Sequence, residues 1–148
     1  MMRYNLFFAF SVILGLVLTS VSIADDTHGV GQRAFVGLWQ AIDGFDGSTQ
    51  LLSITCSSDR SCEVRLNDTA FTLSCDNQIG FARGVGSIKR NVLTVALTLY
   101  CSNLDGTSTL AGTQANEFVL DRRNRTLTNI NDDPLSSGPN VFHNISSQ

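Results

Sequence analysis

Charged residues are scarce in this chain, and their balance is acidic. They make up 16% of the 148 residues, with 13 acidic side chains against ten basic ones. An acidic chain has no overall electrostatic attraction for nucleic acid or for an anionic membrane, so the sequence predicts no nucleic-acid partner. Serine, threonine, asparagine and glycine are abundant instead, which is typical of secreted β-proteins with many turns.

Histidine is also rare, which limits the catalytic chemistry open to the protein. The two histidines, His28 and His143, fall in terminal segments that we expect to be mobile, where neither is held as a general base. No serine lies in a strand–turn–helix nucleophile elbow. Glu63, Glu117 and Asp121 fall on outward or turn positions, which weakens an acid–base pair for glycoside hydrolysis. We therefore predict no catalytic residues and no enzyme, and a hydrolase is a distant third hypothesis.

Long apolar runs are absent except near the N-terminus, where Leu6–Leu18 is almost wholly apolar. This run of about 13 residues is short of the roughly 20 that a spanning helix needs. Arg3 precedes it, and Ser22-Ile23-Ala24 then places small residues three and one positions before Asp25, as in a cleavable secretory signal. We predict a signal peptide over residues 1–24, a secreted or periplasmic protein, and no membrane span after cleavage.

The remaining chain would be about 124 residues long, which is the size of one domain. Without Arg3 it carries nine basic and 13 acidic residues, a net charge of about −4. The polar segment 25–33 is predicted to be a flexible leader. A β-barrel domain is expected over residues 34–130. Residues 131–148, which contain both prolines, are predicted to form an irregular C-terminal tail.

The pattern that recurs between turn signals is a period-two alternation of apolar and polar residues, which predicts an all-β fold. Asp43–Gly47 and Asn67-Asp68 are typical turn sequences. About eight strands are predicted, over residues 34–42, 50–56, 62–66, 69–75, 79–89, 91–101, 109–120 and 125–130. An antiparallel meander of eight strands closes readily into an up-and-down β-barrel without exposed edges. A two-sheet β-sandwich is the alternative, because it shows the same alternation.

Four cysteines, Cys56, Cys62, Cys75 and Cys101, follow the predicted signal into an oxidising compartment, where cysteines are usually paired. Their spacing does not match a four-cysteine metal site, whose ligands come in pairs two to four residues apart. We predict no metal and no cofactor. Two disulfides are favoured, Cys56–Cys62 across a hairpin and Cys75–Cys101 around the fifth strand. Cys56–Cys75 with Cys62–Cys101 is the open alternative.

The predicted meander places all four cysteines at one end of the fold, because strand direction alternates along the chain. Two of them flank the turn between the second and third strands, and the others end the fourth and sixth strands. The first strand begins at the same end, so Trp39 is expected toward it. The opposite end, with the turns Asp43–Gly47, Asn67-Asp68 and Asp121–Asn124, is the predicted binding mouth.

Two further segments have structural interpretations that we favour over functional ones. Arg83–Lys89 is glycine-rich, but no helix N-terminus follows it to bind a phosphate. Its glycines are instead expected to mark a bend or a close approach within a strand. Arg122, Arg123 and Arg125 form a basic cluster on a hairpin loop. A solvated turn is the simpler interpretation, and a contact patch for an acidic partner is the alternative.

Gly37-Leu38-Trp39 lies in the first predicted strand and holds the only tryptophan. A Gly-x-Trp at this place resembles the signature of the calycin superfamily, which includes lipocalins, avidins and similar bacterial protease-inhibitor barrels. The resemblance implies a barrel over residues 34–130 in which Gly37 and Trp39 are structural and Trp39 packs across the closed end. In that family an arginine from the end of the last strand often covers the tryptophan, whereas Arg125 opens the last predicted strand, at the other end.

These features predict a non-enzymatic β-barrel that binds a small apolar ligand. The candidate lining or core residues alternate along the predicted strands and are Leu52, Ile54, Phe71, Leu73, Leu93, Val95, Leu97 and Phe118. Side chains of this kind can also fill a small barrel and leave no cavity. The alternative function is a protein-binding module, such as an inhibitor of a secreted enzyme, that uses its loops or the leader at residues 25–33.

Overall fold

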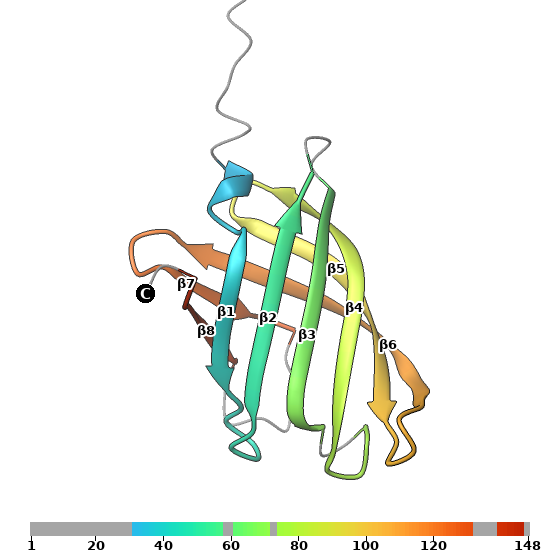
Figure 1. Cartoon of the computed structure of the whole chain (residues 1–148). Coiled ribbons are helices and arrows are strands. Elements are labelled where there is room, and N and C mark those ends of the chain that lie inside the picture. Colours follow the sequence, from blue (N-terminus) through green and yellow to red (C-terminus); the bar gives the residue numbers. More distant parts are fainter. Residues whose placement is uncertain (1–30, 58–60, 72–73, 132–138, 147–148) are drawn as a thin grey trace, which may run out of the picture.

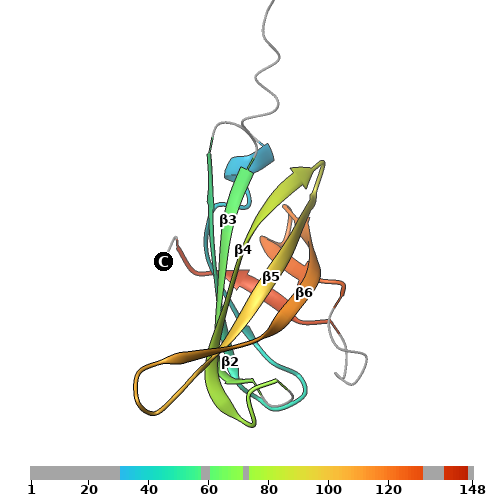
Figure 2. The same cartoon turned by 90° about the vertical axis from the view of Figure 1, so that its right-hand side faces the viewer.

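Eight antiparallel strands close into one barrel in which every strand pairs with its neighbours in chain order (Figures 1 and 2). The computed structural model describes residues 31–57, 61–71, 74–131 and 139–146. The strands are β1 (Gly37–Ile42), β2 (Thr49–Cys56), β3 (Ser61–Phe71), β4 (Gln78–Lys89), β5 (Val92–Ser102), β6 (Ser108–Asp121), β7 (Thr126–Asn129) and β8 (Val141–Asn144). The predicted up-and-down barrel is therefore confirmed over the β-sandwich. The predicted signal peptide lies outside the described residues.

The predicted hairpin at Asn67-Asp68 is wrong, because both residues lie inside β3. Asn67 pairs with Leu51 of β2 on one side and with Phe81 of β4 on the other. The Asp68 carboxylate accepts a hydrogen bond from the Ala70 backbone N–H, 3.1 Å away. The register of the β3–β4 ladder shifts just beyond this point. The local preference of these residues for a turn is thus met by a bulge within a continuous strand.

The predicted irregular tail is also wrong in part, because residues 141–144 form β8. This strand pairs with β7 on one side, and it closes the barrel by pairing with Trp39 and Gln40 of β1 on the other. Phe142 points inward and is 1% exposed. A four-residue strand has room for one inward apolar side chain, so it shows no alternation for a sequence pattern to detect. The barrel consequently extends well beyond residue 130.

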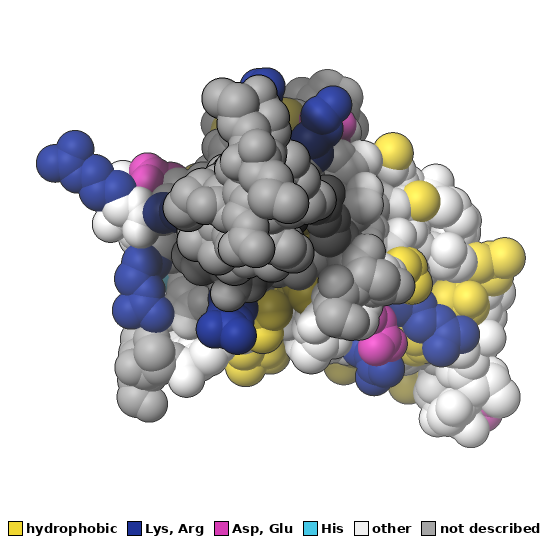
Figure 3. Space-filling view, turned by 90° about the horizontal axis from the view of Figure 1, so that it is seen from above, with side chains coloured by type: hydrophobic (Ala, Val, Ile, Leu, Met, Phe, Trp, Pro, Cys, Tyr) yellow, Lys and Arg dark blue, Asp and Glu magenta, His cyan; other side chains and the backbone are white. Residues whose placement is uncertain are grey.

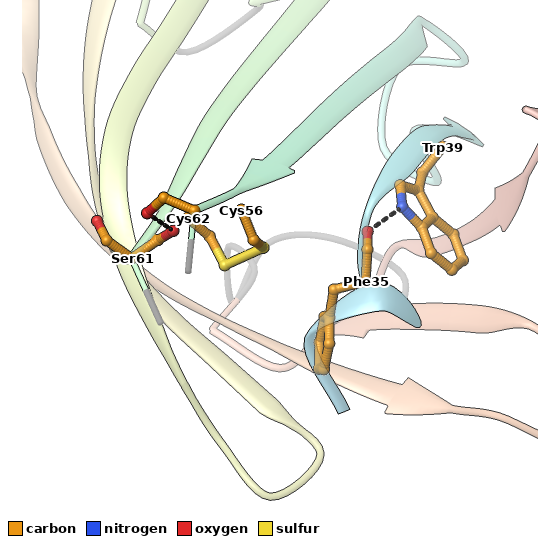
Figure 4. The surroundings of a disulfide bond; sticks show 6 residues. Phe35, Trp39, Cys56, Ser61 and Cys62 are labelled. Carbon is orange, nitrogen blue, oxygen red and sulfur yellow. Dashed lines mark hydrogen bonds between the residues drawn. A yellow bond between two sulfur atoms is a disulfide. The ribbon is translucent and has the colours of Figure 1, made fainter. Parts of the chain in front are cut away.

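A short helical turn covers the end of the barrel from which β1 starts. Residues 31–33 are helical, although the sequence predicted a flexible leader through residue 33. Phe35 follows this turn and is fully buried. The indole N–H of Trp39 donates a hydrogen bond to the Phe35 carbonyl, 2.9 Å away (Figure 4). Trp39 and Phe35 are therefore buried together and joined by a hydrogen bond at this end of the barrel.

The two disulfides are the favoured pairs, Cys56–Cys62 and Cys75–Cys101. They lie at opposite ends, however, so the prediction of a single cysteine-rich end is wrong. Cys56–Cys62 lies at the Trp39 end, beside the Phe35 turn (Figure 4). Because β3 runs the full length of the barrel without the expected hairpin, Cys75 comes after its far end. The Cys75–Cys101 disulfide is thus at the end opposite Trp39 because β3 continues through Asn67-Asp68, where the sequence predicted a hairpin.

The turn at Asp121–Asn124 was placed at the wrong end for the same reason. Val119, near the end of β6, pairs with Val92 at the start of β5. This register brings the β6–β7 turn to the Trp39 end and away from the predicted mouth. Arg125, which precedes β7, is therefore at the same end as Trp39 and not at the opposite end, and its side chain is exposed.

Glycines in β4 allow close approach between strands, as the sequence predicts. A Cβ atom on Gly84 would overlap the backbone carbonyl of Ala96, and one on Gly86 would lie 2.6 Å from the carbonyl oxygen of Thr94. Both neighbours are backbone atoms of β5, which cannot move aside as a side chain can. The glycines therefore permit the curvature of β4 and β5 that is visible in Figure 2.

Candidate functional site

An open cavity of about 380 Å³ occupies the half of the barrel opposite Trp39. Its apolar wall includes Leu66, Ala82, Leu97 and Leu99, with Phe71 at the end of β3. Its rim includes the β1–β2 turn. The half of the barrel near Trp39 is filled instead, by fully buried side chains such as Phe35, Leu52, Ile54, Leu93, Phe118 and Phe142. One end of the barrel is thus packed and the other is hollow.

The change from packed to hollow follows the chemistry of the inward-facing positions. In β2 the inward residues are Gln50, Leu52 and Ile54, and in β7 they are Leu127 and Asn129. In each strand the polar residue lies on the side away from Trp39. The same holds for Asp68 in β3 and for Asn116 in β6. The aliphatic packing of the interior thus ends where the polar positions begin, and the open half of the barrel starts there.

A hydrogen-bond network links the turn after β1 with three buried polar side chains. The Gln50 side-chain amide donates to the carboxylates of Asp43 and Asp68, at 2.9 and 3.0 Å. The Asn140 side chain donates to Asp43 at 3.2 Å and to the Gln50 carbonyl oxygen at 3.3 Å. Asn140 immediately precedes β8, so the network connects the C-terminal segment of the barrel to β2 and β3. These bonds hold two carboxylates in fixed positions at the cavity wall.

Asp68 is the most buried carboxyl of this network, with 3% of its surface exposed. Burial raises its pKa above the ordinary value, and hydrogen bonds from the Ala70 N–H and the Gln50 side chain oppose the shift. Among the described residues that line the cavity, none is a lysine, arginine or histidine. Hydrogen-bond donors of the protein, and not a cationic side chain, therefore stabilise the Asp68 carboxylate.

A second polar pair lies across the cavity from Asp68. The Asn129 amide donates to the Asn116 side-chain oxygen at 3.1 Å, and the Asn116 amide donates to the Gln114 carbonyl at 3.1 Å. Both asparagines are largely buried and line the cavity. Since each amide is oriented by a protein partner, the lone pairs and N–H groups that face the cavity have defined directions. Such fixed polar groups can orient a bound molecule.

The structure distributes the predicted lining residues between the two halves of the barrel. Phe71 and Leu97 line the cavity. Leu52, Ile54, Leu93, Val95 and Phe118 belong to the packed core, and Leu73 lies outside the described residues. Gly37 has a φ of 140°, and a Cβ atom there would lie 2.5 Å from the Ser146 hydroxyl oxygen. Together with the burial of Trp39, this gives both residues of the Gly-x-Trp motif a structural role.

The sequence did not predict four buried polar side chains of the cavity, Gln50, Asp68, Asn116 and Asn129, or Asn140, which is hydrogen-bonded to Asp43 and Gln50. A signal for most of them was present, because they continue the inward period-two register of apolar positions. Asn140 had no such signal, since it precedes a strand that was not predicted. Of the residues considered for catalysis, Glu63 is exposed and forms an ion pair with Arg65, and His143 is an exposed residue of β8.

Within the described ranges, no helix is long and apolar enough to cross a membrane. The same ranges contain no group of three or more His, Cys, Asp or Glu side chains placed to hold a metal ion. Comparison of the chain with models of protein families, with curated proteins and with solved structures finds no match.

Proposed function

We propose that this protein is a secreted or periplasmic binding barrel of calycin type that holds a small molecule in the cavity opposite Trp39. The observation that carries the proposal is the change of the inward-facing side chains along the barrel. They are packed and apolar at the Trp39 end, and the other end is hollow and lined in part by polar groups. A volume of about 380 Å³ falls in the range of small-molecule sites, which is roughly 300–1,000 Å³. Two disulfides indicate an oxidising environment and support a location outside the cytoplasm.

The lining favours an amphipathic ligand over the wholly apolar one that the sequence suggested. Leu97, Leu99 and Phe71 offer a wall for an apolar body, while the Asp43 and Asp68 carboxylates and the Asn116–Asn129 pair offer fixed polar partners. Carboxylates accept hydrogen bonds and attract positive charge. The preferred ligand therefore has an apolar portion of modest size and a head group rich in hydrogen-bond donors, such as an amine. We propose binding without catalysis.

Native mass spectrometry of protein purified from its own host tests the proposal. We expect a bound mass that is retained in Val85→Trp, whose side chain lies on the outer wall and is 67% exposed. The bound mass should be lost in Leu97→Trp, which fills the cavity. An empty wild-type protein, or equal retention by both variants, would contradict ligand binding. A protein recovered in place of a small molecule would support the alternative function, a protein-binding module.

A probe of known chemistry tests the preference for an amphipathic amine. The fluorescent amine 1-aminoanthracene has an apolar body and a polar head, and its emission rises in a dry site. We expect it to bind the wild-type protein and to bind Asp68→Asn more weakly. Anthracene itself, which has no head group, should bind both proteins equally weakly. Equal binding of the amine to both proteins would contradict the assigned role of the Asp68 carboxylate.

A further inference from the structure

Basic side chains gather at the Trp39 end of the barrel, although they are scattered in the sequence. Three segments supply them, namely the helical turn before β1, the β4–β5 turn and the β6–β7 turn. We call this surface the basic end, and it consists of Arg33, Lys89, Arg90, Arg122, Arg123 and Arg125, all of them exposed. Figure 3, which views the molecule from this end, shows Lys and Arg side chains projecting around it.

The contacts between the three segments make the basic end one continuous surface. The Leu120 backbone N–H donates to the Asn91 carbonyl at 2.8 Å, which joins the β6–β7 and β4–β5 turns. A guanidinium nitrogen of Arg122 lies 3.5 Å from the position that a Cβ on Gly31 would occupy. The β6–β7 turn therefore also reaches the helical turn. Folding thus brings together the hairpin cluster noted in the sequence and three further cations from distant segments.

The charge of the basic end is not neutralised by the carboxylate nearest to it. Asp121, at the start of the β6–β7 turn, accepts hydrogen bonds from the backbone N–H groups of Arg123 and Asn124 and from the Asn124 side chain. These bonds lower its pKa and direct its oxygens into the turn. Arg65 and Glu63 form an ion pair on β3. Among the residues that the structure describes, no carboxylate pairs with Arg33, Lys89, Arg90, Arg122 or Arg123.

Five of the 13 acidic residues lie at the other end of the barrel. The turns and strand ends there carry Asp43, Asp46, Asp68, Asp76 and Asp105. A strand as long as β5, with its 11 residues, spans about 35 Å. This length is several times the Debye length of about 8 Å at physiological ionic strength. These five carboxylates are therefore screened from the basic end, so its local charge is more positive than the net charge of the chain suggests.

We propose that the basic end docks the protein on an anionic lipid surface, with the cavity facing away from it. The cations stand on three separate turns and project without a shared pocket for one acidic side chain, so they match a broad layer of negative charge. The exposed cations of this surface complement the negative head groups of anionic lipids, and this complementarity carries the proposal.

Sedimentation with lipid vesicles tests the proposal. The mature protein, purified after secretion without the predicted signal peptide, is mixed with vesicles of phosphatidylcholine containing phosphatidylglycerol, and with vesicles of phosphatidylcholine alone. We expect binding to the anionic vesicles at low ionic strength, little binding to the neutral ones, and release by added salt. Because each Lys or Arg near such a surface strengthens partitioning about fivefold, Arg122→Gln combined with Arg123→Gln should weaken binding about 25-fold.

A matched pair of substitutions separates the basic end from net charge. Arg65→Gln combined with Arg83→Gln removes two positive charges from the barrel wall, where both residues are exposed, and should leave vesicle binding nearly unchanged. An equal loss in both double variants would overturn the proposal, as would failure of the wild-type protein to bind anionic vesicles. Binding to soluble polyglutamate without binding to vesicles would also overturn it, in favour of an acidic protein partner. None of these outcomes depends on ligand binding in the cavity.

Discussion

Substitution of Phe142 by alanine tests whether β8 closes the barrel. Phe142 is 1% exposed, and its ring meets that of Phe118 edge-on, with centroids 5.9 Å apart. Removing a buried phenylalanine lowers the free energy of unfolding by about 3–5 kcal/mol, of which the ring pair accounts for about 0.5–1.5 kcal/mol. A loss of this size is a large part of the stability of a small domain. We therefore expect Phe142→Ala to unfold at far lower urea concentration than the wild-type protein.

The fluorescence of the single tryptophan measures this unfolding directly, because Trp39 is buried and pairs in register with Asn144 of β8. Val141→Ala is the matched control, since Val141 lies in the same strand but is 41% exposed, and its effect should be about 0.5 kcal/mol or less. A double-mutant cycle with Phe118→Ala isolates the ring pair. If Phe142→Ala and Val141→Ala had similar small effects, residues 141–144 would not form part of the core.

Three further predictions concern the disulfides, the bend in β4 and the buried carboxyl. Removing the Cys75–Cys101 disulfide by a double alanine substitution should lower the free energy of unfolding by about 3.5 kcal/mol, and removing Cys56–Cys62 in the same way should lower it by about 2 kcal/mol, because Cys75–Cys101 closes the longer loop. Urea titrations of the two double variants measure this difference, and the reverse order would contradict it. Gly84→Ala should lower the thermal unfolding temperature, because its Cβ would overlap the Ala96 backbone, whereas Gly112→Ala, with nothing within 4 Å of its Cβ position, should not. Equal effects of the two substitutions would argue against a close approach of β4 and β5. Since burial raises the pKa of Asp68, its contribution to stability is full below the unfolded pKa and is lost as pH rises through the folded pKa. Asp68→Asn should therefore gain stability relative to wild type in urea titrations as pH rises above the ordinary aspartate pKa of about 4, and a difference that does not change with pH would refute the shift.

The alternation of residues in the long strands was sufficient to predict the barrel and its core. Leu93, Val95 and Leu97 occupy every second position of β5, so all three point to the same face of the sheet. That face must be the buried one, because the residues between them are less apolar. The turn signal at Asn67-Asp68 misled because aspartate can satisfy a backbone N–H either in a turn or in a bulge. Which of the two forms depends on pairing with both neighbouring strands, and a local sequence does not contain that information.

One local error had a global consequence for the predicted site. Dividing β3 in two reversed the direction of every later strand, which put Cys75 and Asp121 at the wrong ends. The cavity itself was not predicted, because its polar lining comes from residues of five strands or turns that no spacing in the sequence connects. The basic end was missed for the same reason. Arg33, Arg90 and Arg122 become neighbours only after the barrel closes.

The seam between β1 and β8 joins two segments about a hundred residues apart, through the pairs Trp39 with Asn144 and Gln40 with His143. A chain synthesised from its N-terminus therefore makes β1 long before the strand that completes it. Until residues 141–144 emerge, β1 and β7 keep open edges that can pair with other chains, and such distant closure is slow. Barrel formation is expected to wait for the whole chain, an order compatible with export as an unfolded polypeptide followed by oxidation of its cysteines.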